Sequence, residues 1–210
     1  MTTRILHIVA SPSAAASRST AVARHLIDRL RERDRAIEVD TLDLWHTELP
    51  AFDATMIEAK FAVLRAKAAT EAQQLRWQQA VDIARRFNAA DKYVFSLPMW
   101  NFGIPYRLKH YIDVVTLPGE NWRWSREEGY RGLLHGKRAA LVYSSAGHYP
   151  SGPAPHEADF QKPYMRKWLS FIGITDVHEL NAAPTLAPPE VVDQAVARGK
   201  AEAGRLALVF

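Results

Sequence analysis

Short apolar runs alternate with helical stretches along this chain, and that alternation limits the fold more than any other feature. The first run, residues 4–10, is nearly all apolar, which is typical of a parallel strand covered on both faces. Further strands are predicted at 37–42, 93–97, 138–143 and 177–180. Strands that alternate with helices in this way predict an α/β fold, a doubly wound five-stranded parallel sheet with helices on both faces.

The segments between these runs carry apolar residues at helical spacing. Val22, Leu26 and Leu30 recur every four residues, and Ser17 and Ser19 precede them as candidate N-caps. More helices are predicted within 53–88, 108–115, 160–171 and 189–208.

Two of the connections are long. Residues 53–88 read as a helical excursion with a second helix, and residues 118–136 read as an insertion before the fourth strand. The positions expected to be buried in the first of these are Leu75, Val81, Ala84 and Phe87. Three tryptophans, Trp45, Trp77 and Trp168, are expected in the core.

Composition narrows the class of protein. A chain of 210 residues with 48% apolar content can fill a core without covalent staples, so we expect one domain over residues 1–210. The absence of cysteine excludes disulfides and thiolate chemistry and suits a reducing cytoplasm. No run approaches the ~20 apolar residues of a membrane span. The net charge of +4 favours anionic ligands, but acids interrupt the bases of residues 29–35, so we expect no nucleic-acid partner.

Ligands of a doubly wound sheet bind beyond the carboxyl ends of its strands. Residues 11–20, Ser-Pro-Ser-Ala-Ala-Ala-Ser-Arg-Ser-Thr, follow the first strand and end at a helix start, where hydroxyls and free N–H groups favour a phosphate. The segment has no glycine, which excludes the Gly-rich dinucleotide fingerprint and the phosphate loop. An ordinary Ser-rich loop with a Ser cap is the alternative.

Two further segments follow the third and fourth strands. Residues 98–105, Pro-Met-Trp-Asn-Phe-Gly-Ile-Pro, form an aromatic loop that suits a flat heteroaromatic ring, unless it only plugs the sheet end. Residues 144–149, Ser-Ser-Ala-Gly-His-Tyr, are small enough for backbone groups to reach the polar edge of the same ring. His148 is a candidate for proton transfer, although a lone histidine beside a ligand loop is more often a hydrogen-bonding or surface residue.

The sequence motifs of metal sites and of one class of hydrolase are missing. The other histidines are scattered without metal-ligand spacing, so no metal site is expected. No Gly-x-Ser-x-Gly elbow occurs, which argues against a hydrolase of that type.

Four motifs together resemble a known family. They are Pro98-Met99-Trp100-Asn101-Phe102, the Leu-Lys-His-Tyr-Ile-Asp run at 108–113, Trp122-Arg123-Trp124-Ser125, and Phe-Ile-Gly-Ile at 171–174. The chain resembles the bacterial FMN-dependent NADH-azoreductases, also called NADH:quinone oxidoreductases, of the flavodoxin-like superfamily, over essentially its whole length. Members often read Ser-Arg-Gly-Gly where this chain has Ser-Ser-Ala-Gly at 144–147, and usually have Tyr where it has Trp100.

The resemblance implies a flavodoxin-like fold that binds FMN. The residues it assigns to the cofactor are Ser11, Ser17, Arg18 and Ser19 around the phosphate, Pro98, Met99, Trp100, Asn101 and Phe102 along the isoalloxazine ring, and Ser144, Ser145, Ala146 and Gly147 after the fourth strand. Trp122 and Trp124 would cap the substrate pocket of the partner in a homodimer.

The implied activity is the transfer of two electrons from NADH through FMN to quinones by a ping-pong mechanism, with azoreductase activity on aromatic azo compounds. NADPH stays open as a donor, because no ribose-reading motif is identifiable. The alternative is a non-catalytic flavodoxin-like electron carrier or redox-responsive module, which the same loops would also serve.

Overall fold

The computed structural model describes residues 2–65, 67–149 and 156–210, and its centre is a parallel sheet. Within these residues five strands pair in the order β2-β1-β3-β6-β7, which is the flavodoxin-like order. The strands are β1 (Arg4–Val9), β2 (Glu38–Asp43), β3 (Lys92–Pro98), β6 (Arg138–Ser144) and β7 (Asp176–Asn181). The prediction of a doubly wound five-stranded parallel sheet is confirmed.

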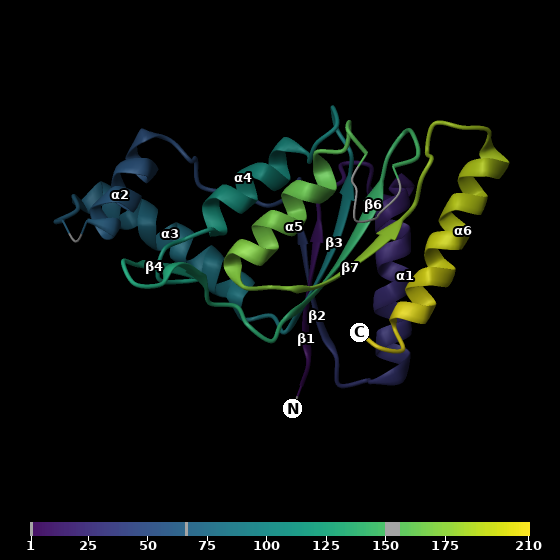
Figure 1. Ribbon diagram of the computed structural model, residues 1–210, viewed down its shortest axis with the longest axis horizontal. Coiled ribbons are helices and arrows are strands. Elements are labelled where there is room, and N and C mark those ends of the chain that lie inside the picture. The colour runs from purple at the N-terminus through teal and green to yellow at the C-terminus, as the bar shows by residue number, and fades with distance from the viewer. Residues whose placement is uncertain (1, 66, 150–155) are drawn as a thin grey trace.

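Helices cover both faces of the sheet (Figure 1). On one face lie α1 (Arg18–Arg33) and α6 (Pro189–Leu206), and on the other lie α3 (Glu71–Asn88), α4 (Tyr106–Val115) and α5 (Gln161–Ile172). Side chains of a strand alternate between the faces. Accordingly Tyr93 and Phe95 of β3 pack with α3, α4 and α5, whereas Val94 packs with α1 and α6.

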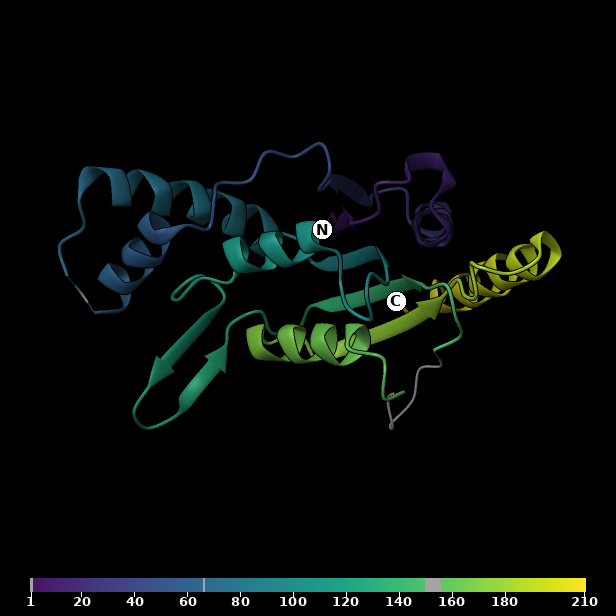
Figure 2. The same cartoon turned by 90° about the horizontal axis from the view of Figure 1, so that it is seen from above.

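The two long connections hold the remaining elements. The 53–88 segment contains α2 (Ala54–Leu64) before α3, and the 118–136 insertion contains an antiparallel hairpin of β4 (Trp122–Ser125) and β5 (Gly129–Gly132). A short 3-10 helix, η1 (Ala14–Ala16), precedes α1. Both Figure 1 and Figure 2 place α2 and the hairpin at the end of the molecule away from α6. Across the described ranges, no helix is long and apolar enough to span a membrane.

The predicted burial of α3 is right for its second half and wrong for its first. Val81, Ala84 and Phe87 are buried against the sheet, but Leu75 is 63% exposed. The first half of α3 extends beyond the sheet beside α2, so helical periodicity there has no core to face. Trp168 lies in the core as predicted. Trp77, also predicted there, is only half-buried and packs against the edge of the core.

Helix α6 approaches α1 and β7 closely at one glycine. A Cβ at Gly199 would lie 2.8 Å from the Asn181 carbonyl oxygen and 3.1 Å from a Val22 methyl group. A Cβ at Gly204, one and a half turns later, would meet nothing within 4 Å. Gly199 therefore sets the distance between this helix and the sheet.

These two glycines make a matched pair of variants. Gly204→Ala should raise the free energy of unfolding by about 0.5–1 kcal/mol, because alanine favours the helix and crowds no neighbour. Gly199→Ala should lower it by about 1–3 kcal/mol, because the new methyl group overlaps backbone. Urea unfolding of both variants measures the difference. Equal effects of the same sign would contradict the close packing at Gly199.

Candidate functional site

Three of the predicted segments follow neighbouring parallel strands, so they emerge at the same edge of the sheet. Backbone hydrogen bonds extend the pairing into them: the Ala10 N–H donates to the Ser96 carbonyl at 2.9 Å, and the Met99 N–H donates to the Ser144 carbonyl at 2.7 Å. The structure therefore brings together the loops at 11–20, 98–105 and 144–149. This edge is the candidate site.

The first loop ends in a cluster of buried hydroxyls at the start of α1. Ser17 is the N-cap, as predicted, because its Oγ accepts from the Thr20 N–H at 3.2 Å. Ser19 lies 3.3 Å from Ser17, Oγ to Oγ, and both side chains are buried with that of Ser11, while Arg18 is exposed. The N–H groups of Arg18 and Ser19 have no acceptor among the described residues. This helix end, with its positive dipole and free donors, has the chemistry that suits an anion.

A polar chain under this loop ties α1 to the sheet. His7 of β1 lies 3.1 Å from Ser96 of β3, Nε2 to Oγ, and the Thr20 hydroxyl donates to the same Ser96 oxygen at 3.3 Å. Burial lowers the pKa of His7 to about 4, and the charge of Arg24 acts in the same direction. His7 is therefore neutral at pH 7 and takes part in an uncharged hydrogen-bond chain that holds the start of α1 over the strand ends.

The second loop is a tight turn with unusual backbone. Trp100 and Gly103 exchange both backbone hydrogen bonds, at 3.0 and 2.9 Å, and the two residues between them have positive φ, 47° at Asn101 and 69° at Phe102. Asparagine tolerates this region, but for other residues it costs roughly 1–2 kcal/mol. Such strain is typical of functional sites. The turn holds the Asn101 and Phe102 side chains outward, the latter 53% exposed.

The third loop is fixed by the segment after β7. Ser144 and Ser145 are buried, and the Ser145 carbonyl accepts from Thr185 through both its N–H, at 2.9 Å, and its hydroxyl, at 3.1 Å. The Ser145 hydroxyl donates to the Gly147 carbonyl at 2.8 Å. Ala146, Gly147 and His148 are exposed. At Ala146 and Gly147 the loop therefore exposes backbone and little side chain at this edge of the sheet.

Trp45 also belongs to this edge of the sheet, and the sequence prediction of a core position is wrong for it. It is half-buried, its Nε1 donates to the Ala10 carbonyl at 3.0 Å, and its ring centroid lies 5.5 Å from those of Trp100 and Tyr106. Arg107 fastens the same segment by donating to the Leu44 and Thr47 carbonyls. The sequence feature that could have placed Trp45 here is its position just after the second strand, because all the parallel strands end at this edge of the sheet.

The three loops contain no acidic side chain. None of the 23 acidic residues of the chain falls in residues 11–20, 98–105 or 144–149. Carboxylates near the helix end would repel an anion, so their absence from these segments favours one.

Trp122 and Trp124 lie on the hairpin, apart from the three loops. The Trp122 ring is buried, with centroids 5.5 Å from Tyr130 and 5.6 Å from Phe171, so within this chain it packs against its own neighbours. Trp124 is exposed. A role of either residue in a partner's pocket stays a prediction.

The buried neutral His7 predicts a pH dependence of stability. Because its pKa falls from 6.5 to about 4 on folding, the folded protein binds fewer protons than the unfolded chain between these values. The stability from neutral His7 is fully present above pH 6.5 and is lost as the pH falls toward 4. Denaturant unfolding should show the free-energy difference between the wild type and His7→Gln changing by about 3 kcal/mol from pH ~7 to ~4. A difference that stays constant with pH would contradict this.

Known proteins resemble the chain over nearly its full length. The family model of the flavodoxin-like fold matches residues 3–206. An FMN-dependent NADH:quinone oxidoreductase from Desulfotalea psychrophila is 41% identical over 204 residues, which cover 97% of this chain and 96% of that protein. FMN-dependent NADH:quinone oxidoreductase 3 from Pseudomonas fluorescens is 40% identical over 203 residues, 95% of this chain and 93% of that protein.

Solved structures agree with the sequence relatives. An azoreductase from Bacillus anthracis has a TM-score of 0.88 at 28% identity, over 99% of this chain and 100% of that one. An FMN-dependent NADH-azoreductase from Bacillus anthracis, solved in complex with FMN, has a TM-score of 0.83 at 26% identity, over 98% and 99% of the two chains. The resemblance found in the sequence is confirmed, and the chain belongs to the flavodoxin-like family that contains the FMN-dependent NADH:quinone oxidoreductases.

Proposed function

We propose that this protein is an FMN-dependent NADH:quinone oxidoreductase that also reduces aromatic azo compounds. The observation that carries the proposal is the meeting of an anion-binding helix end with an aromatic turn at the ends of neighbouring strands β1, β3 and β6. Relatives that are about 40% identical over nearly their whole length carry this activity in their names.

The residues at the start of α1 fit the phosphate of FMN. The free N–H groups of Arg18 and Ser19 and the hydroxyls of Ser11, Ser17 and Ser19 supply donors, and Arg18 adds charge from the exposed side. Phosphates bind at helix ends of this kind without a glycine-rich loop.

The other two loops fit the ring. The segment from Pro98 to Phe102 offers aromatic surface, and the backbone N–H groups of Ala146 and Gly147 have no acceptor in the described part of the chain. They remain available to the polar edge of a flavin. The Ser145 hydroxyl is used within its own loop, so the arginine that relatives often carry there has no side-chain substitute at this position.

FMN, when bound, accepts a hydride from NADH and passes two electrons to a quinone or azo acceptor. The chain's own residues bind the phosphate, orient the ring and leave one side of the turn at 100–103 open to flat molecules. Donor and acceptor would then use the same opening in turn, which gives ping-pong kinetics. The loops carry no acid, so water or the exposed His148 would supply the protons.

We also propose that two copies of the chain form a homodimer through α2 and the start of α3. Exposed apolar side chains gather there: Ile57, Phe61, Val63, Leu64 and Leu75. Exposed apolar side chains concentrated on neighbouring helices are typical of an interface. In such a dimer the exposed Trp124 on the hairpin would be free to reach the partner's site.

The dimer is tested by sedimentation of Phe61→Glu beside Leu208→Glu, which puts the same charge on an exposed apolar residue at the C-terminal end of the chain. Phe61→Glu should weaken association by about tenfold or more, because a charge replaces an apolar contact at the interface. Leu208→Glu should sediment as the wild type does. A monomeric wild type at micromolar concentration would overturn the proposal.

The activity is tested by one anaerobic spectral titration. FMN added to the purified protein should bind, its visible bands should bleach with NADH, and they should return when a benzoquinone is added, because electrons enter and leave through one cofactor. A protein that binds FMN but is bleached by neither NADH nor NADPH, and that accumulates semiquinone with dithionite, would be an electron carrier instead. A protein that binds no FMN would contradict the site itself.

A further inference from the structure

Three polar side chains at and just before the start of α5 are buried beside the candidate site. Asp159, Gln161 and Lys162 are each at most 2% exposed. Asp159 caps the helix, since its Oδ1 accepts from the Gln161 and Lys162 N–H groups, both at 3.0 Å. The N-cap residue itself, Phe160, makes no side-chain cap.

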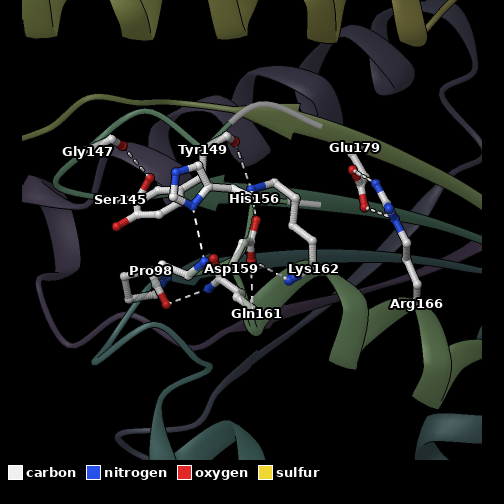
Figure 3. A network of polar contacts seen from close by, with 11 residues as sticks. Pro98, Ser145, Gly147, Tyr149, His156, Asp159, Gln161, Lys162, Arg166 and Glu179 are labelled. Atoms are coloured by element: carbon white, nitrogen blue, oxygen red, sulfur yellow. Dashed lines mark hydrogen bonds and ion pairs between the residues drawn. The ribbon is translucent and has the colours of Figure 1, made fainter. Parts of the chain in front are cut away.

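The same residues fasten the two loops that are proposed to hold the ring (Figure 3). Lys162 Nζ donates to Asp159 Oδ2 at 2.7 Å and to the Tyr149 carbonyl at 2.9 Å, at the end of the third loop. Its ammonium also lies 5.0 Å from the centroid of the Tyr143 ring, at the end of β6. Lys162 is thus fixed between its own helix and the third loop.

The turn after β3 is fastened at both of its ends. Gln161 Nε2 donates to the Pro98 carbonyl at 2.7 Å, and the Phe160 N–H donates to the Phe102 carbonyl at 2.9 Å. The start of α5 therefore bonds to both loops, although they follow different strands.

Stability alone does not require a charged pair here. The side chains of Lys162 and Asp159 are 3% and 0% exposed, and a buried ion pair of this kind is often no more stable than well-packed apolar residues of similar size. What an apolar pair could not supply is the second donor of Lys162, which binds the Tyr149 carbonyl.

We propose that Asp159, Gln161 and Lys162 form a positioning unit that sets the spacing between the 98–103 turn and the 144–149 loop. The inference rests on the proposed flavin site, because that spacing matters only if one ring contacts both loops. A misplacement of about 1 Å at a reacting centre can cost about 100-fold in rate. The unit touches neither loop's outward side chains and acts through their backbone.

The informative variant is Asp159→Asn with Lys162→Met. Asparagine keeps the oxygen that caps α5, and removing both charges avoids a lone buried carboxylate. The matched control is Arg29→Met, which breaks the exposed Arg29–Glu32 pair on α1.

The first readout needs no cofactor. In the FMN-free protein, hydrogen exchange should quicken about tenfold or more in the double variant at the bonded amides of the 98–103 turn and at Thr185 and Leu186, whose N–H groups bond to the 144–149 loop. Exchange in the central strands should stay as in the wild type. With FMN bound, kcat/KM for the quinone should fall about tenfold or more and the flavin bands should shift. Arg29→Met should match the wild type in every readout.

Two results separate this inference from the proposed function. Exchange and kcat/KM within about twofold of the wild type would overturn the positioning unit and leave the function intact. Quickened exchange in a protein whose wild type binds no FMN would support the fastening but overturn its link to a flavin. If the double variant does not fold, Gln161→Leu removes only the bond to Pro98, and unchanged exchange at 99–103 would overturn the proposal.

Discussion

The parallel pairing of β1, β3 and β6 is the constraint on which the rest of the structure depends. Because these strands run in one direction side by side, their carboxyl ends fall on one edge of the sheet. Segments that start some 45 to 135 residues apart in the sequence, at Ser11, Pro98 and Ser144, thereby become neighbours. The loops that we propose to carry the chemistry are short, and the pairing of the strands determines which of them meet.

The loops are held by interactions that a sequence does not display. The neutral His7 and the pair of Asp159 with Lys162 both bury polar groups, which is favourable only where every partner is in place. Phe102 holds a positive φ that its side chain disfavours. The positive φ costs stability locally, and the buried polar groups would cost stability without their partners. Both depend on the packed layers of helices around the sheet, which is the pattern expected of a functional site.

The architecture could be predicted from the sequence because the spacing of apolar residues indicates which side chains are buried. In an α/β protein, the buried side chains are those between the sheet and its two layers of helices. The sequence predicted the five strands, the Ser17 cap and the three loops of the candidate site. The prediction failed where apolar residues have a regular spacing but no core to pack against, or pack against a distant part of the chain. Leu75 has helical spacing but lies beyond the sheet, and the hairpin around Trp122 depends on packing against Phe171, far along the chain. The positioning unit at the start of α5 was not foreseen because backbone carbonyls, which are invisible in a sequence, are its targets.

The central claim is that one flavin spans the ends of β1, β3 and β6, and a crystal structure of the protein grown with FMN tests it most directly. The phosphate should lie within about 3 Å of the Arg18 and Ser19 N–H groups and the Ser17 hydroxyl. The ring should contact the turn at 99–102 on one side and the backbone of Ala146 and Gly147 at its polar edge. A phosphate bound away from the start of α1, or a ring that contacts only one of the two loops, would contradict the claim.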